Sequence, residues 1–144
     1  MLAPLETAIL AALEAGKEIL KIYHSGDFNI EIKGDNSPLT KADTASHKLI
    51  MRYLNKTEIP VLSEEGRAID YRERKDWKQL WIVDPIDGTK EFIKRNGEFT
   101  VNIALVEDQK TSIGVIFVPA TGILYFSTKA IGAFTVSYTH LRAH

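Results

Sequence analysis

The sequence predicts an α+β fold in which helices are layered on an antiparallel sheet. Two stretches in the first half of the chain carry apolar residues at helical spacing. The second half instead holds short runs in which apolar and polar residues alternate, separated by turn residues, and this pattern is typical of strands joined by hairpins. We therefore expect the helices to cover a sheet formed mainly by residues 80–135.

The first helix is expected between Leu5 and Tyr23, because apolar residues recur there at three- and four-residue steps and so share one face. This pattern ends near Ser25. Alternating residues at 28–32 then predict a short half-buried strand, and the sequence Gly-Asp-Asn-Ser-Pro at 34–38 predicts a loop.

A second helix is expected after that loop. Thr40 and Asp43 have the spacing of an N-terminal capping box, with a shorter acid in the position of Glu. Apolar residues continue at helical spacing as far as Leu54. A capping role alone would account for Thr40 and Asp43.

Two later apolar runs lead into acidic residues. The string SEEG follows the run at 60–62, and the string DPIDGT follows the run at 81–83. Pro85 has no N–H to donate to a ladder and holds Asp84 extended, so the second strand is expected to stop at Asp84. A short helical stretch is expected to follow and to end near Asn96.

The remaining strands form a predicted antiparallel meander. They are expected at residues 99–105, 113–118, 123–126 and 130–135. Residues 119–122 form a turn between the second and third of them. Between the two acidic strings, the residues from Arg67 to Lys78 carry mixed charge with little periodicity, so we expect a solvated loop or a poorly packed helix there.

The bulk composition excludes several classes of protein. A chain of 144 residues with 44% apolar residues is long enough for one globular domain with a core. Because there is no cysteine, disulfides, thiolate metal sites and cysteine nucleophiles are excluded. A net charge of −1 argues against a general nucleic-acid binder, whose surface should be clearly basic.

The sequence also bears on location and on zinc and serine chemistry. No apolar run approaches the length of a transmembrane segment, so we expect a cytoplasmic protein, with peripheral association to the inner membrane left open. His24 and His47 lack the spacing of zinc ligands, and His140 and His144 lie at the end of the chain. Ser63 has no evident histidine partner, which disfavours a serine hydrolase.

Four acids could share one site if the two strand ends meet. They are Glu64, Glu65, Asp84 and Asp87. Clustered carboxylates raise one another's pKa and are tolerated chiefly where cations compensate them. Oxygen ligands favour Mg²⁺ over zinc, and a pair of such ions can bind both the attacking and the leaving oxygen of a displacement. The carbonyl of Ile86 and the N–H groups of the following helix start would add a cation ligand and phosphate donors.

Each acid also has a plain structural interpretation. Asp87 could be the N-cap of the following helix, and Glu64 with Glu65 could form an ordinary solvated turn. For one acid in isolation these interpretations would be preferred. The string DPIDGT shifts the balance, because its Pro, Gly and Thr each have a separate mechanical role and chance agreement at all six positions is rare.

The motifs of this chain resemble those of a known superfamily. DPIDGT at 84–89, SEE at 63–65 and SPLTKAD at 37–43 resemble the lithium-sensitive, magnesium-dependent phosphatases that include inositol monophosphatases and fructose bisphosphatases. The continuation KEFIKRNGEFTVNIAL at 90–105 resembles in particular the bacterial 3′(2′),5′-bisphosphate nucleotidases. This resemblance implies the N-terminal part of the inositol monophosphatase-like αβαβα fold. It also implies Mg²⁺-dependent hydrolysis of adenosine 3′,5′-bisphosphate, a small molecule of sulfur metabolism, to AMP and phosphate.

The resemblance further implies roles for individual residues. The implied metal ligands are Glu64, Asp84, Asp87 and the carbonyl of Ile86. Asp43 and Thr89 would orient and deprotonate the attacking water, with Glu65 just behind the ligands. The backbone N–H groups of Gly88 and Thr89 would hold the scissile phosphate. A second phosphate could be neutralised by basic residues that would otherwise form a solvated helix face, namely Lys90, Lys94 and Arg95.

The resemblance runs from Leu5 to about Phe134, so residues 1–135 are expected to form a metal- and phosphate-binding domain. Complete members continue for about another domain, which carries a further metal-ligand Asp and most substrate contacts. We therefore expect little or no turnover from this chain alone. An inositol or sugar phosphate phosphatase, or a non-catalytic metal- or anion-binding fragment, is the alternative, and the oligomeric state is left open.

Residues 136–144, with the sequence VSYTHLRAH, do not extend the strand pattern. They resemble the translation of a transposase-type sequencing adapter. We therefore exclude them from the fold prediction.

Overall fold

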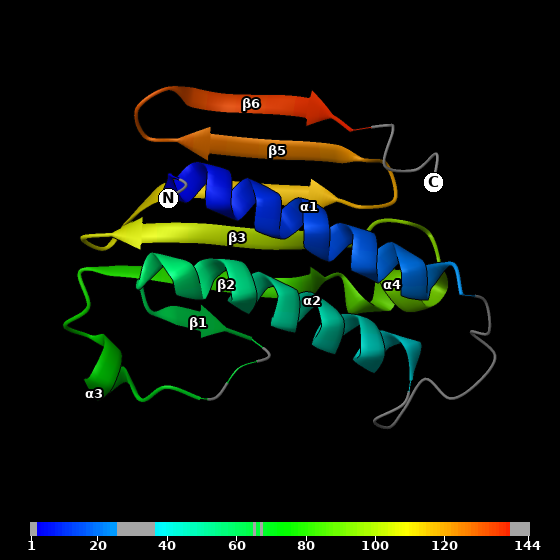
Figure 1. Ribbon diagram of the computed structural model, residues 1–144, viewed down its shortest axis with the longest axis horizontal. Coiled ribbons are helices and arrows are strands. Elements are labelled where there is room, and N and C mark those ends of the chain that lie inside the picture. Colours follow the sequence, from blue (N-terminus) through cyan, green and yellow to red (C-terminus); the bar gives the residue numbers. More distant parts are fainter. Residues whose placement is uncertain (1–2, 26–36, 65, 67, 139–144) are drawn as a thin grey trace.

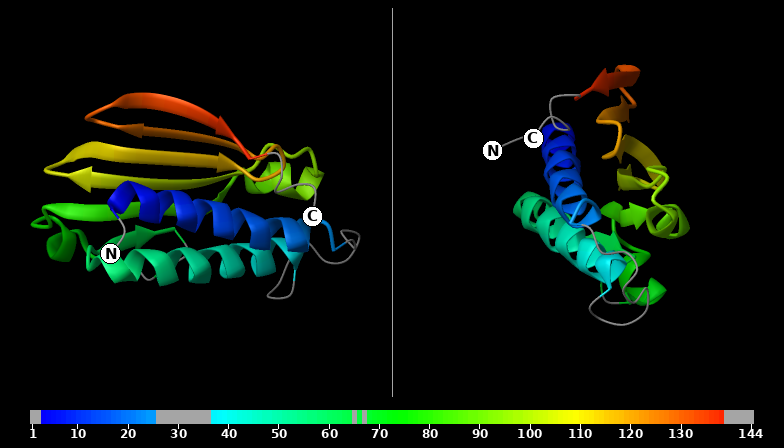
Figure 2. Two further views of the ribbon diagram at one scale, coloured as in Figure 1. Left: turned by 45° about the horizontal axis from the view of Figure 1, so that its top comes forward. Right: turned by 90° about the vertical axis from the view of Figure 1, so that its right-hand side faces the viewer.

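The predicted α+β architecture is confirmed by a computed structural model, which describes residues 3–25, 37–64, 66 and 68–138. Two long helices, α1 (Pro4–Tyr23) and α2 (Pro38–Leu54), lie side by side across one face of a six-stranded sheet (Figure 1). Figure 2 shows these helices as one layer and the sheet as a second layer. The sheet face turned away from α1 and α2 is called the open face below.

The six strands lie in chain order from one edge of the sheet to the other. They are β1 (Val61–Ser63), β2 (Gln79–Asp87), β3 (Thr100–Glu107), β4 (Lys110–Val118), β5 (Ile123–Thr128) and β6 (Gly132–Ser137). Strands β2 to β6 pair antiparallel, and β3 to β6 are the predicted meander. Strand β1 instead runs parallel to β2, so the sheet is mixed.

Three short helical segments complete the described elements. They are η1 (Asn55–Thr57), α3 (Tyr71–Arg74) and α4 (Thr89–Lys94). Segment α3 is the only helical turn in the mixed-charge stretch that the structure describes, and none of its residues is buried. This agrees with the expected solvated loop.

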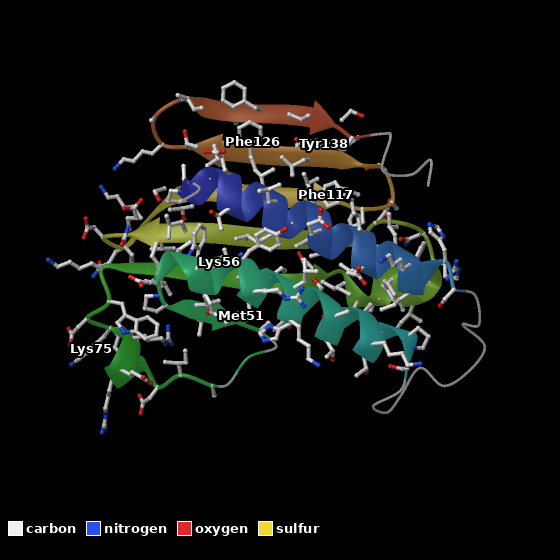
Figure 3. All side chains as sticks on the ribbon, viewed as in Figure 1. Met51, Lys56, Lys75, Phe117, Phe126 and Tyr138 are labelled. Atoms are coloured by element: carbon white, nitrogen blue, oxygen red, sulfur yellow. The ribbon has the colours of Figure 1, made fainter. Side chains whose placement is uncertain are left out.

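Helix α1 lies close to the sheet because small residues form much of its buried face. These residues are Ala8, Ala11, Ala12, Ala15 and Gly16. At the closest approach Gly16 faces Phe117 of β4, and a Cβ added to Gly16 would overlap the phenyl ring. Figure 3 labels Phe117 next to α1. Glycine is therefore required at position 16 by the ring of Phe117.

Three aromatic side chains fix α4 against the end of α1. The ring centroid of Tyr23 lies 5.3 Å from that of Phe92 and 4.9 Å from that of Phe99. Phe92 and Phe99 are 5.2 Å apart, edge to face, and both are fully buried. Such pairs add to the stability gained from burial alone. The chain that follows the string DPIDGT is therefore anchored in the core.

The start of α2 differs from the prediction. The helix begins at Pro38, and the Oγ of Ser37 accepts a hydrogen bond from the N–H of Thr40 at 3.1 Å. Ser37 is thus the N-cap, and the prediction of a capping box at Thr40 and Asp43 is wrong by one helical turn. Serine before proline is the stronger start signal, because serine caps the helix and proline fits its first position.

Strand β2 does not stop at Asp84, which corrects a second prediction. It continues to Asp87, with Asp84 opposite Asn102 and Asp87 opposite Thr100. Three steps on β2 therefore face two on β3, which is a β-bulge. Pro85 lies inside this bulge, where the ladder is interrupted and the missing N–H of proline carries little cost.

Strand β6 extends past residue 135. Val136 pairs with Leu124, Ser137 pairs with Ile123, and the N–H of Tyr138 donates to the carbonyl of Gly122 at 2.6 Å. The prediction that the strand pattern ends at residue 135 is therefore wrong for Val136 and Ser137. A β-branched residue opposite Leu124 continues a ladder readily.

Some predictions fall outside the described residues. They concern the strand at 28–32, most of the loop at 34–38, and residues 139–144. None of the described helices is both long enough and apolar enough to cross a membrane.

Candidate functional site

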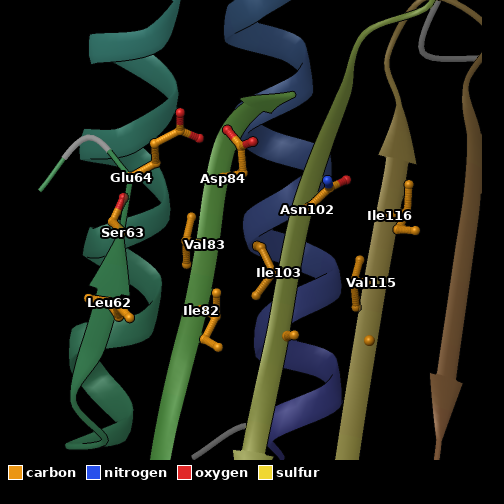
Figure 4. Close-up of a pocket in the computed structure, with 12 residues that line it drawn as sticks. Leu62, Ser63, Glu64, Ile82, Val83, Asp84, Asn102, Ile103, Val115 and Ile116 are labelled. Atoms are coloured by element: carbon orange, nitrogen blue, oxygen red, sulfur yellow. The ribbon is translucent and has the colours of Figure 1, made fainter. Parts of the chain in front are cut away.

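The parallel pairing of β1 and β2 brings the two acidic strand ends together. Leu62 lies opposite Ile82 and Ser63 opposite Val83, so the next residue of each strand is acidic. The N–H of Glu64 donates to the carbonyl of Val83 at 3.1 Å, which keeps Glu64 beside Asp84. Figure 4 shows the two carboxylates next to each other, Glu64 just after β1 and Asp84 within the neighbouring β2.

Alternation along β2 places Asp84 on the open face. Trp81 and Val83 are buried under the helices, whereas Ile82 is exposed and Asp84 is half-buried. The carboxyl group of Glu64 lies beside that of Asp84. Burial, the adjacent carboxyl group of Glu64 and the negative charges of Glu64 and Asp87 raise the pKa of Asp84 from 3.8 to about 7.

Asp87 is joined to the same strand edge through Asn102, a residue that sequence reasoning missed. The Nδ2 of Asn102 donates to Oδ2 of Asp87 at 3.0 Å. The Oγ1 of Thr100 donates to Oδ1 of Asn102 at 2.9 Å and so orients the amide. The only signal in the sequence was a polar residue in an alternating run, and its partner lies 15 positions away.

The turn after Asp84 is held tightly from two sides. Ser46 of α2 is fully buried, and its Oγ donates to the carbonyl of Pro85 at 2.9 Å. Ile86 is buried next to it. Gly88 has φ of 88°, and a Cβ there would lie 3.1 Å from the carbonyl oxygen of Glu98. Glycine is required at position 88 both for the left-handed backbone and for this close approach.

The predicted water-activating residues lie on two different helices. Asp43 is on α2, one turn before Ser46, and Thr89 begins α4, which contacts α2. Their pairing stays a prediction. Glu65 falls outside the described residues, so its predicted place behind the ligands is not described.

The three basic residues after the turn differ from one another. Lys90 and Lys94 are exposed on α4. The guanidinium of Arg95 lies 4.5 Å from the centre of the Tyr23 ring, and its Nη1 donates to the carbonyl of Tyr23 at 2.7 Å. The described contacts of Arg95 thus join α4 to the end of α1.

Ser63 does have a histidine partner, contrary to the prediction. The Nδ1 of His47 lies 3.0 Å from Oγ of Ser63, which is hydrogen-bonding distance. His47 is on α2, so this contact places the Ser63 side chain on the helix-covered side of β1. Ser63 therefore points away from the neighbouring carboxylates of Glu64 and Asp84.

A groove of about 600 Å³ runs over the open face from the acidic pair (Figure 4). One end is formed by Glu64, Asp84 and Asn102. The remainder is lined largely by apolar side chains of neighbouring strands, among them Ile82 and Ile116. The groove is thus polar at the strand ends and apolar along the sheet.

The donor chemistry at this edge suits a hard cation. Glu64, Asp84 and Asp87 offer only oxygen atoms, and a cation beside them would relieve the repulsion that raises the pKa of Asp84. Within the described part of the chain, however, no three His, Asp or Glu side chains are close enough to count as a metal-binding group. The described geometry therefore provides a converging pair of carboxylates with a third nearby.

Comparison with a family model and with curated proteins points to the same protein family. A sequence model of the inositol monophosphatase family matches residues 2–143. The 3′(2′),5′-bisphosphate nucleotidase CysQ of Escherichia coli O157:H7 is 47% identical over 117 residues, which are 79% of this chain and 47% of that protein. CysQ of Haemophilus influenzae is 36% identical over 132 residues, which are 90% of this chain and 49% of that protein. The chain spans about half the length of the curated relatives it matches.

Solved structures agree with these relatives. A crystal structure of CysQ from Bacteroides thetaiotaomicron superposes with a TM-score of 0.87 at 56% identity, covering 92% of this chain and 48% of that chain. The extragenic suppressor protein SuhB from Bartonella henselae superposes with a TM-score of 0.75 at 30% identity, covering 90% of this chain and 50% of that chain. The sheet with helices on one face is therefore the N-terminal portion of this fold.

Proposed function

Because the chain belongs to the inositol monophosphatase family, we propose that it is the metal- and phosphate-binding part of a magnesium-dependent phosphatase. The proposed reaction converts adenosine 3′,5′-bisphosphate to AMP and phosphate. The observation that carries the proposal is the convergence of Glu64 and Asp84 at one strand edge, with the pKa of Asp84 raised to about 7. Strongly perturbed acids of this kind are characteristic of functional sites.

The proposed Mg²⁺ ligands are Glu64, Asp84, Asp87 and the carbonyl of Ile86. Bound Mg²⁺ would supply Lewis-acid stabilisation of phosphate oxygens and would lower the pKa of the attacking water. The carboxylates of the chain would bind the Mg²⁺ ion. The side-chain amide of Asn102 donates to the carboxylate of Asp87 and so fixes its orientation. Hydrogen-bonded ligands are held in one orientation, which favours binding.

The remaining roles concern protons and phosphate. Asp43 and Thr89 would accept a proton of the attacking water as its oxygen forms a bond to phosphorus. The bond between phosphorus and the ribose oxygen would break, and that oxygen would take up a proton from solvent equivalent to the one removed from the attacking water, so that one water molecule is added across the P–O bond. The N–H groups of Gly88 and Thr89 would hold the phosphate, and exposed Lys90 and Lys94 could neutralise a second one. The third predicted basic residue, Arg95, contacts Tyr23 through its guanidinium.

The extent of the functional unit is part of the proposal. Residues 1–135 would form the metal- and phosphate-binding domain. The matched residues make up only 47% of the CysQ relative, so we expect low turnover from the chain alone. Resequencing the coding locus would test whether residues 136–144 come from an adapter.

Two measurements test the proposed function. Isothermal titration with MgCl₂ should show binding to the wild-type chain and loss of at least tenfold in affinity for Asp84→Asn. Phosphate release from adenosine 3′,5′-bisphosphate and from inositol 1-phosphate, measured on the chain and on its full-length relative, should favour the nucleotide. Equal Mg²⁺ affinity of wild type and Asp84→Asn would refute the metal site. Binding without any turnover in either protein would instead favour a non-catalytic metal-binding role.

A further inference from the structure

Two consecutive residues of α2 contact the two acidic strand ends separately. Ser46 donates through Oγ to the carbonyl of Pro85 at 2.9 Å, immediately after Asp84. His47 lies 3.0 Å, through Nδ1, from Oγ of Ser63, immediately before Glu64. We propose that Ser46 and His47 are positioning residues. From the helix-covered side of the sheet, they set the distance between the carboxylates of Glu64 and Asp84. This inference rests on the proposed function, because it concerns the same metal ligands.

Burial makes the hydrogen bond of Ser46 costly to break. Ser46 is fully buried, so its hydroxyl has little water to bond with and its contact with Pro85 is costly to break. The acceptor lies in the β-bulge, where the pairing of β2 with β3 is interrupted. Ser46 therefore adds a contact from α2 at the point where the sheet itself holds the turn least.

The His47 contact acts on the other strand. Strand β1 is only three residues long and lies at the edge of the sheet. Besides its pairing with β2, its last residue Ser63 is held by His47. Because side chains alternate along a strand, holding Ser63 toward α2 turns the following Glu64 toward the open face.

Together the contacts of Ser46 with Pro85 and of His47 with Ser63 hold the two strands at a fixed distance, and we call this pair of contacts the brace. Ser46 and His47 are adjacent on one rigid helix, so the carbonyl of Pro85 and the hydroxyl of Ser63 cannot drift apart independently. Glu64 and Asp84 directly adjoin these two contact points, so the distance between their carboxylates depends on that separation. Residues that orient metal ligands from behind change metal affinity by about 10–100-fold when they are removed.

Magnesium titration provides the first test. Ser46→Ala and His47→Leu should each weaken Mg²⁺ binding by about tenfold. His47→Asn keeps a hydrogen-bonding atom near the place of Nδ1 and should restore most of the affinity. The matched control is Thr7→Val, which removes a comparable hydrogen bond from Thr7 Oγ1 to the Ala3 carbonyl on α1. Thr7→Val should lower the melting temperature without changing Mg²⁺ affinity.

A metal-free readout separates this inference from the proposed function. Hydrogen exchange of the Glu64 amide, which donates to Val83, should be several-fold faster in Ser46→Ala and His47→Leu than in Thr7→Val. The Trp81 amide, which donates to the carbonyl of Pro60 at the other end of β1, is the internal reference and should not change.

The outcomes are distinct. If wild type binds no Mg²⁺ but the Glu64 amide exchanges faster in Ser46→Ala and His47→Leu while the Trp81 amide does not, the proposed function fails and the brace stands. If Mg²⁺ affinity and Glu64 exchange in both variants match those of Thr7→Val, the brace is refuted, whatever the activity of the wild type.

Discussion

The two faces of the sheet are used in opposite ways. On the helix-covered face, Trp81, Val83 and Phe117 are buried. On the open face, Ile82 and Ile116 remain 44% and 45% exposed although they lie in the same strands. The acidic pair lies at the end of this open face. Successive residues of one strand therefore face different surroundings: one face stabilises the fold, and the other presents the acidic pair.

The largest difference should appear between Trp81 and its neighbour Ile82. Trp81→Ala leaves a cavity under the helices and removes the hydrogen bond from Nε1 to Oγ1 of Thr57, so we expect a loss of about 3–5 kcal/mol in the free energy of unfolding. Ile82→Ala should cost much less. Urea denaturation followed by circular dichroism measures both. Equal losses would show that the open face is also part of the core.

A pair of glycines sharpens the same comparison. Gly16→Ala forces a methyl group into the ring of Phe117 and should destabilise the fold by about 1–3 kcal/mol. At Gly114 on β4, an added Cβ meets only the Ser127 hydroxyl at 3.4 Å, an approach that small adjustments can relieve. Gly114→Ala should therefore change the melting temperature far less than Gly16→Ala. A larger effect at Gly114 would contradict the difference between the faces.

Asp84→Asn should move stability and function in opposite directions. The pKa of Asp84 is raised in the folded chain, so its contribution to stability is full below about pH 4 and is lost as the pH rises through about 7. The metal-free Asn variant should therefore melt at a higher temperature than wild type at pH 8, with little difference at pH 4. The gain should be modest because Asp84 is partly solvated. Asp76→Asn, on an exposed acid, is the control, and a destabilised Asp84→Asn would contradict the expectation.

The smallest stability effect is expected on the open face itself. Ile116→Thr should change the free energy of unfolding by less than about 0.5 kcal/mol. Because exposed apolar patches promote association, the variant should also self-associate less in sedimentation velocity runs at high concentration. A loss of several times that free energy would mean that the open face is covered in solution.

Local pattern was enough to predict much of the fold. Helix α1 and the hairpins from β3 to β6 are formed by neighbouring segments, and their periodicities were read correctly. The parallel pairing of β1 with β2 was not predicted, because the residues of each strand do not specify its orientation relative to the other strand. The continuation of β2 through Pro85 depends on a bulge that only the partner strand reveals.

The site shows the same division. The acids were found because each follows an apolar run. Asn102, Ser46 and His47 were missed, since their partners lie 15, 39 and 16 positions away and their residue types are ordinary for a strand or a helix. The roles of Glu64, Asp84 and Asp87 as metal ligands stay predictions that the titrations above can decide.

The parallel pairing of β1 and β2 also bears on the order of folding. Hairpins close over a few residues, whereas 15 residues, 64–78, separate the end of β1 from the start of β2. We therefore expect the meander to form before β1 docks, so that the acidic pair is assembled in a late step. A cation that binds the pair would then slow unfolding and leave the refolding rate nearly unchanged. In this protein the edge with the acidic pair would be the last part of the sheet to form and the first to open.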